Sequence, residues 1–144
     1  MAEDATPRLA VSIRGLHYHY PGVPALSGLD LDLAAGSFCA LVGQNGSGKT
    51  TLGKHLNGLL KPGAGRVQVY GRDTRTLSVG GLARDVGYVF QNPDHQIFSS
   101  SVREELSFGP RNLGLAAAEV RARVADALHA FVAAAERNRH TKPA

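Results

Sequence analysis

The stretch GQNGSGKT at residues 43–50 decides the fold, because it matches the pattern G-x-x-x-x-G-K-[S/T] at every fixed position. It follows the nearly all-apolar run SFCALV at residues 37–42, which is typical of a strand covered on both faces. After it comes TTLGKHLNGLL, at residues 50–60, in which leucines recur at helical spacing. A strand, a glycine-rich turn and a helix in this order predict a phosphate-binding loop.

The capture of an anion explains these residue types. Glycines carry no Cβ, so the backbone can wrap with its N–H groups toward a phosphate. The helix that follows adds its unpaired amides and the positive end of its dipole. We expect Lys49 to bridge the β- and γ-phosphates of a nucleotide and the Thr50 hydroxyl to take one Mg²⁺ position. The residues predicted to hold the nucleotide in this loop and the first helical turn are Gly43, Asn45, Gly46, Ser47, Gly48, Lys49, Thr50 and Thr51.

The spacing of the glycines argues against a Rossmann dinucleotide site. They read G-x-x-G-x-G, whereas the dinucleotide fingerprint is G-x-G-x-x-G. No acidic residue lies between Asp32 and Asp73, so the ribose-binding carboxylate about 20 residues further on is missing. The Rossmann interpretation is rejected.

The composition is that of a protein with a buried core. Hydrophobic residues make up 43% and charged residues 19% of 144, which is enough apolar material for one domain or part of a larger one. The longest apolar run, Ala130–Ala135, is far shorter than the roughly 20 residues that span a bilayer, and no secretory block follows Met1. The single Cys39 excludes an internal disulfide and is expected to be a small core residue. We expect a soluble cytosolic domain.

The charge pattern does not point to nucleic acid. Sixteen basic and twelve acidic side chains give a net charge of +4, and the basic residues are scattered without a block of five like charges. This favours a solvated basic surface over a nucleic-acid patch. A small positive net charge also suits a phosphate ligand.

The patterns outside the loop predict strands and helices in α/β order. Loose alternation predicts strands at 9–20 and 29–33. RVQVY, followed by Gly71, predicts another at 66–70, and VGYVF predicts a short buried strand at 86–90. The turn Pro21–Gly22 follows the first of these strands.

Two helices are predicted further along the chain. Ser101 and Glu104 match the capping box at a helix start, and Gly109–Pro110 is expected to end that helix. Apolar residues at helical spacing predict a second, amphipathic helix from Ala116 to about Glu136, packed in a helical subdomain. Its predicted apolar stripe consists of Val120, Val124, Leu128, Phe131 and Ala135.

Three separated stretches together resemble the N-terminal part of an ABC transporter ATPase subunit of the energy-coupling factor type, a group that takes up cobalt, nickel or vitamins. HYHYPG at 17–22 resembles the aromatic A-loop, LVGQNGSGKTTL at 41–52 the Walker A motif, and VGYVFQNPDHQIF at 86–98 the Q-loop. VREELSFGPRNLGL at 102–115 is typical of the energy-coupling factor ATPases in particular. The resemblance covers residues 9–130.

The resemblance implies roles for residues beyond the loop. Tyr20, followed by Ala25–Leu26, stands where an aromatic ring stacks on adenine. Gln91 matches the glutamine that reaches Mg²⁺ and the attacking water, so Thr50 and Gln91 are the implied metal contacts. His95 and Gln96 have no second ligand at a metal spacing, so we interpret them as loop residues or contacts to a membrane subunit.

The implied fold is the α/β P-loop NTPase core of the ABC ATPase type, with an antiparallel β subdomain and the start of a helical subdomain. We expect a disordered N-terminus at 1–8, a partial ATP-binding domain at 9–136 and a polar tail at 137–144. Within that domain, Walker A spans 43–50 and the helical subdomain starts at about residue 99.

The parts with which the family hydrolyses ATP do not occur in these 144 residues. They are the LSGGQ signature, a Walker B strand ending in Asp and Glu, and a switch histidine. LSVGG at 77–81 matches the signature only in part and precedes the Q-loop, so we interpret it as a connecting loop. Because loss of a general base alone removes ~10²–10⁴ in rate, this chain, truncated before the signature, is expected not to hydrolyse ATP by itself.

The resemblance implies an ATP-binding subunit of an importer, peripheral on the inner face of the cell membrane, with ATP and Mg²⁺ as cofactors. A transmembrane subunit would contact the Q-loop and helical region at 91–110, a second ATPase subunit would complete a dimer, and no nucleic acid is expected. Two alternatives remain: a non-hydrolysing nucleotide-binding fragment, and a soluble ABC protein acting on nucleic acid, which the scattered arginines disfavour. A P-loop GTPase or kinase is disfavoured because no Asn-Lys-x-Asp motif occurs.

Overall fold

The computed structural model describes residues 8–92 and 96–140, with side chains described up to Ala133 in the last helix. The chain divides into two compact units, Met1–Tyr88 and Val89–Ala144, and each is described here by itself. Residues 1–7 of the predicted disordered start and 141–144 of the predicted polar tail lie outside the described ranges.

The first unit is built on a four-stranded antiparallel sheet in the order β2-β1-β3-β4. Tyr20 pairs with Val23 across the two-residue turn Pro21–Gly22, so the predicted strand at 9–20 and the turn after it are confirmed. The second strand begins six residues before the predicted range of 29–33. The strands are β1 (Leu9–Tyr20), β2 (Val23–Ala34), β3 (Ala64–Val69) and β4 (Arg72–Asp73). β4 pairs with β3 and was not expected from the sequence.

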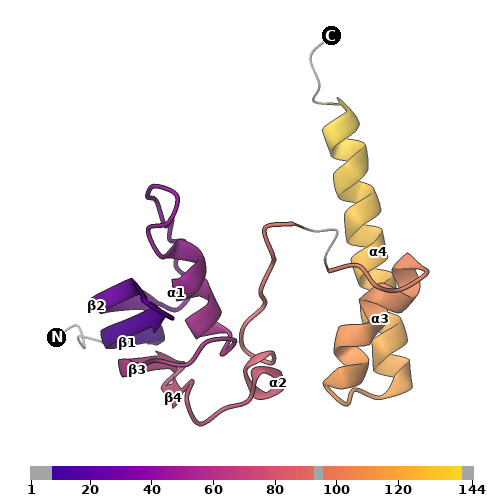
Figure 1. The fold of residues 1–144 in the computed structure, drawn as a ribbon. Helices are drawn as coiled ribbons and strands as arrows, with labels where there is room; N and C mark the ends of the chain where they lie inside the picture. Colours follow the sequence, from indigo (N-terminus) through magenta and orange to yellow (C-terminus); the bar gives the residue numbers. More distant parts are fainter. Residues whose placement is uncertain (1–7, 93–95, 141–144) are drawn as a thin grey trace, which may run out of the picture. The chain divides into compact units, whose positions relative to one another are not determined.

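Helix α1 (Lys49–Leu56) lies along one face of this sheet (Figure 1). Its Leu52 joins Ile13, Leu16 and Val67 in the buried core, and Leu56 packs at the edge of that cluster. Full burial of such a side chain contributes about 1.5–3 kcal/mol, so this small cluster holds the helix against the strands. The leucine spacing predicted the helix correctly, although the helix ends at Leu56, four residues before the end of the pattern at residue 60.

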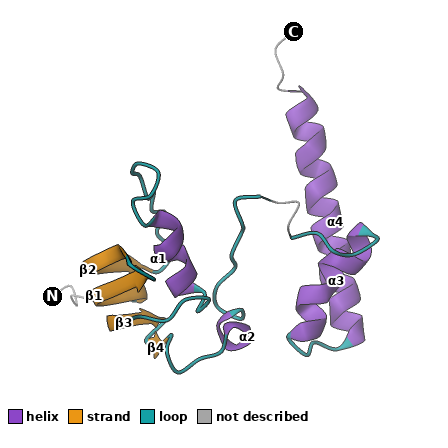
Figure 2. Ribbon diagram, viewed as in Figure 1, coloured by secondary structure: helices purple, strands orange, loops and turns teal. Residues whose placement is uncertain are grey.

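Two predicted strands are not formed. Residues 37–42 and 86–90 have no strand structure, and Figure 2 shows the chain between β2 and α1 as a loop. Phe38 is 97% exposed and Val42 90%, and Cys39 is exposed as well, so the prediction of a buried cysteine is wrong. A strand has no hydrogen bonds of its own and forms only beside another strand. The described residues contain none that pairs with either segment.

The polar connection that follows β3 is more ordered than its sequence suggested. It contains the single helical turn α2 (Val79–Leu82), capped by the Ser78 hydroxyl, which accepts a hydrogen bond from the Gly81 N–H at 3.1 Å. The stretch at 77–81 is therefore partly helical, where a connecting loop was predicted. Lys61 donates to the carbonyls of Thr74 and Leu77 at 2.5 and 2.6 Å, which fixes the connection to the end of the α1 region.

In the second unit, α3 (Val102–Asn112) packs against α4 (Ala117–His140). The predicted helix start is confirmed, because the Ser101 hydroxyl accepts from the Glu104 N–H at 3.2 Å. The Glu104 carboxylate, which the capping box would direct to the Ser101 N–H, accepts instead from the Ser100 hydroxyl at 2.9 Å. The predicted stop at Gly109–Pro110 is wrong. A proline so close to a helix end removes one backbone bond only, and the next turn still closes through Leu113 N–H to the Gly109 carbonyl at 3.0 Å.

The apolar stripe of α4 is buried along part of its length. Val120 and Val124 are buried, whereas Phe131 is 67% exposed. Figure 1 shows the end of α4 extending past α3, and α4 continues into the first residues of the predicted polar tail. Among the helices of residues 8–92 and 96–140, none combines the length and apolar character needed to cross a membrane.

Candidate nucleotide-binding site

The loop at residues 43–50 closes around the ammonium group of Lys49. Lys49 Nζ donates to the carbonyl oxygens of Gly43 and Gln44, both at 2.7 Å, and to the Ser47 hydroxyl at 3.3 Å. Asn45 and Gly46, at the tip, are exposed. A cation therefore sits inside an open, glycine-rich loop and is satisfied by oxygens that an incoming anion can replace.

Helix α1 begins at the end of this loop without a side-chain cap. Its N-cap residue is Gly48, which has no side chain to accept from the N–H groups of the first turn. Those amides and the positive end of the helix dipole lie beside Lys49. Two sources of positive potential, the ammonium and the helix start, thus converge on one place.

The loop rests directly on the start of β2. Gly48 has φ +86°, and a Cβ at this position would lie 2.8 Å from the Ala25 carbonyl oxygen and 2.9 Å from Leu26 Cδ2. Only glycine fits this close approach and this backbone conformation. The segment Ala25–Leu26, which the resemblance implicated through the A-loop, is therefore in contact with the phosphate-binding loop.

Tyr20 reaches the same region from the end of β1. Its hydroxyl lies 3.4 Å from Thr51 Oγ1, at hydrogen-bond distance, and 37% of the residue is exposed. Thr51 is buried, whereas Thr50 is exposed beside the loop. Tyr20 and the loop, which are far apart in the sequence, are thus brought together. Of the two threonines that follow Lys49, only Thr50 is open to solvent.

Two residues beside Tyr20 were not singled out from the sequence. The Tyr18 ring meets the Tyr20 ring edge-on at 5.1 Å and the His55 ring edge-on at 4.8 Å. His55 Nδ1 lies 2.8 Å from the Thr51 carbonyl, and burial lowers the pKa of His55. The alternation of β1 places Tyr18 and Tyr20 on one face, but only the fold shows that this face meets α1.

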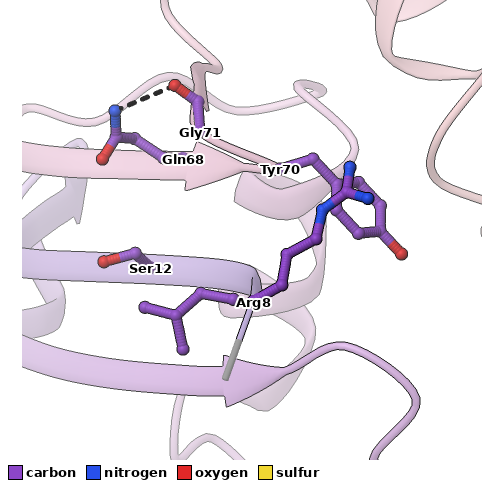
Figure 3. A pocket seen from close by; sticks show the side chains of 6 residues that line it. Arg8, Ser12, Gln68, Tyr70 and Gly71 are labelled. Carbon is purple, nitrogen blue, oxygen red and sulfur yellow. Dashed lines mark hydrogen bonds between the residues drawn. The ribbon is translucent and has the colours of Figure 1, made fainter. Parts of the chain in front are cut away.

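A separate hollow of about 380 Å³ lies beside the start of β1 and the end of β3 (Figure 3). The Arg8 guanidinium lies over the Tyr70 ring at 5.2 Å from its centre, and Gln68 donates to the Gly71 carbonyl at 3.1 Å. Arg8 and Gln68, two of its polar side chains, therefore contact other residues of the same lining. None of its lining residues belongs to the loop at 43–50.

Comparison with protein families gives a match over most of the chain. A family model described as "ABC transporter" matches residues 26–143. The chain belongs to the ABC transporter family. The predicted fold, the ABC ATPase core with its antiparallel β subdomain, is confirmed.

Relatives of this ABC chain confirm the resemblance to energy-coupling factor ATPases. It is 55% identical over 116 residues to energy-coupling factor transporter ATP-binding protein EcfA1 of Symbiobacterium thermophilum, covering 80% of this chain and 40% of that protein. It is 48% identical over 121 residues to the EcfA protein of Syntrophomonas wolfei, covering 82% of this chain and 44% of that protein. The chain thus spans less than half the length of either relative.

A solved ABC structure matches the fold as well. The match is to CbiO1 of Clostridium perfringens, described as part of the ABC transporter complex CbiONQ. The TM-score is 0.71 and the identity 36%, covering 85% of this chain and half of that one.

The ABC family implies ATP binding, and the loop of this chain fits a nucleotide phosphate. Mg²⁺ typically binds through one or two protein ligands together with the phosphates of its nucleotide. Thr50, which is exposed and directly follows Lys49 in the first turn of α1, can supply such a ligand with its hydroxyl. Among the residues that the structure describes, no cluster of three His, Cys, Asp or Glu side chains offers a metal site of its own.

The Q-loop residue lies in the second unit. Gln91 is exposed and directly follows Phe90, whose carbonyl oxygen accepts from Gln96 Nε2 at 3.4 Å. His95 lies outside the described residues. The role of Gln91 at the nucleotide stays a prediction from the family resemblance.

Proposed function

We propose that this chain binds MgATP at residues 43–50 as the nucleotide-binding part of an ATPase subunit of an energy-coupling factor importer for a metal ion or vitamin. The observation that carries the proposal is the Lys49 ammonium, held by two loop carbonyls at 2.7 Å directly before an uncapped helix start. These contacts are replaceable, because phosphate oxygens are stronger acceptors for an ammonium than carbonyl oxygens are.

Each residue then has a defined task. Lys49 exchanges its loop carbonyls for phosphate oxygens, and the first amides of α1 donate to the same phosphates. The hydroxyl of the exposed Thr50 would hold Mg²⁺, and the Tyr20 ring, beside Thr51, would stack on adenine. Bound MgATP supplies the phosphoanhydride bond whose cleavage drives transport in the complete complex.

Binding without turnover is expected from these 144 residues alone. They contain no Walker B carboxylate and no signature, and Gln91 by itself positions water without taking its proton. Sustained Mg²⁺-dependent hydrolysis that is abolished in Lys49→Ala would contradict this part of the proposal.

A charge-removal pair tests nucleotide binding. Lys49→Ala deletes the ammonium in the loop, whereas Lys54→Ala removes the same charge from the next turn of α1. Because a hydrogen bond to a charged group contributes about 1.5–3 kcal/mol, we expect Lys49→Ala to weaken binding of a fluorescent ATP analogue at least tenfold. Lys54→Ala should leave it within twofold. Equal effects of the two variants would show only general charge attraction.

We further propose that the segment 91–110 contacts a transmembrane subunit, with a second ATPase subunit in the same complex, which would keep the protein at the inner face of the membrane. Apolar side chains exposed on this segment support the proposal: Ile97, Phe98 and Val102 are all about two-thirds exposed. Phe98 packs edge-on against Phe108 at 4.6 Å, which gives the surface a fixed shape. Ile97→Asp with Val102→Asp should abolish co-purification with that membrane subunit and leave ATP binding intact.

A further inference from the structure

Four residues from β1 and α1 form a closed ring of contacts. Tyr20 reaches Thr51 through its hydroxyl at 3.4 Å, and the Thr51 carbonyl holds His55 Nδ1 at 2.8 Å. The His55 ring meets Tyr18 at 4.8 Å, and Tyr18 meets Tyr20 at 5.1 Å, which closes the ring. We call these four residues the tyrosine–histidine ring.

The two elements contribute to this ring at their natural spacings. Tyr18 and Tyr20 are two residues apart on a strand, so they share a face. Thr51 and His55 are four residues apart on a helix, so they lie one above the other on one side of α1. The strand face and the helix side meet only because α1 packs on the sheet.

The aromatic contacts fix orientation. The Tyr18 and Tyr20 rings cross at 86° and the Tyr18 and His55 rings at 77°, so both pairs are edge-to-face. This arrangement places the positive edge of one ring on the negative face of the next and is preferred over a face-to-face sandwich. His55 is fully buried and tied to a backbone carbonyl, so it gives Tyr18 a rigid support.

The geometry points to Tyr18 and His55 as positioning residues for the purine of the nucleotide. This inference rests on the proposed nucleotide site and assigns neither residue a contact with the ligand. Both act through Tyr20: they hold its ring against the first turn of α1 before the base arrives. A ring fixed in advance loses less conformational entropy when a purine stacks on it, and the gain appears as affinity.

The test separates the purine from the phosphates. The purified chain is titrated with MgATP and with magnesium tripolyphosphate, which offers the phosphates without a base. Tyr18→Leu removes the supporting ring, and we expect it to weaken MgATP binding about three- to tenfold with no change for tripolyphosphate. Tyr18→Phe keeps the ring and should restore wild-type affinity for MgATP.

Two further variants complete the design. His55→Leu removes the other supporting ring while keeping an apolar side chain, and the same purine-specific loss is expected. Tyr70→Leu makes the matched change at a partly exposed tyrosine outside the tyrosine–histidine ring and should alter neither titration.

Each outcome decides the inference. If Tyr18→Leu and His55→Leu lose affinity for both ligands, the residues support the whole fold and the inference is wrong. If neither titration changes, Tyr20 does not depend on them and the inference is equally wrong. A wild-type chain that binds neither ligand would instead overturn the proposed function itself.

Discussion

At the scale of single residues, the site depends on a few positions where close packing leaves no space for a different side chain. Gly48 and His55 are the clearest cases, because one has no space for a Cβ and the other is buried against a strand. Both positions follow from the packing of α1 and of the loop before it. Each gives a prediction that can be tested without a ligand.

Replacing glycines in the loop should have unequal costs. Gly46 and Gly48 both have positive φ, so an alanine at either position pays about 1–2 kcal/mol for its backbone conformation. Only at Gly48 would the new Cβ also collide with Ala25 and Leu26, whereas Gly46 has open space. We expect Gly48→Ala to lower the free energy of unfolding by roughly 2–4 kcal/mol in urea, and Gly46→Ala by about 1–2 kcal/mol. Equal losses would contradict the contact with β2.

The stability of the first unit should depend on pH through His55. Burial lowers the pKa of His55 below its usual 6.5, so the unfolded chain takes up this proton first as the pH falls. The contribution of His55 to stability is therefore complete above about pH 6.5. It falls by about 1.4 kcal/mol for each pH unit below that value, until the folded chain takes up the proton as well. The His55 imidazole faces the Tyr18 side chain and the backbone carbonyls of Thr51 and Lys61.

Urea unfolding at pH 7.5 and pH 5.0 measures this dependence. His55→Leu should flatten it, and His19→Leu, at an exposed position of β1, should not. A slope that persists unchanged in His55→Leu would assign the effect to other groups.

At the scale of elements, local signals predicted most of the structure. Alternation predicted β1 and part of the second half of β2, leucine spacing predicted α1, and the pair Ser101 and Glu104 predicted the start of α3. Each of these depends on neighbours in sequence or on one adjacent hairpin. The strands expected at 37–42 and 86–90 depend on distant partners, which an apolar run cannot reveal.

The cap of α3 offers a test of one such local signal. Ser101→Ala removes the side-chain acceptor for the Glu104 N–H, which costs about 1 kcal/mol. We expect amide exchange in the first turn of α3 to become about fivefold faster. Ser101→Asn supplies another good cap and should restore the protection. No change in Ser101→Ala would show that the cap does not limit opening of this turn.

At the scale of the whole molecule, the candidate site was predictable where chemistry is written in the sequence and unpredictable where it depends on packing. The loop residues were predicted from their own pattern and Tyr20 from the family resemblance, and the structure brings Tyr20 to Thr51. Tyr18 and His55 were missed, because only the packing of α1 on the sheet brings them together. The role of Gln91 was also predicted from the family resemblance, and it stays a prediction.

The apolar segment at residues 37–42, before the loop, also depends on packing across the whole molecule. Phe38 and Val42 are exposed and the segment has no ladder partner among the described residues. We expect the amides at 38–42 to exchange at least a hundredfold faster than those of Val11 and Ile13, which lie in β1 between two strands. Equal protection would show that a partner strand pairs with this segment.

The central claim, that MgATP binds at the loop, is tested most directly by amide exchange with and without MgATP. The account predicts slower exchange at residues 44–51, where the backbone N–H groups would donate to phosphates, and no change at 68–72 beside the hollow of Figure 3. Lys49→Ala should remove the effect. Protection at 68–72 with none at 44–51, or none at either, would contradict the account.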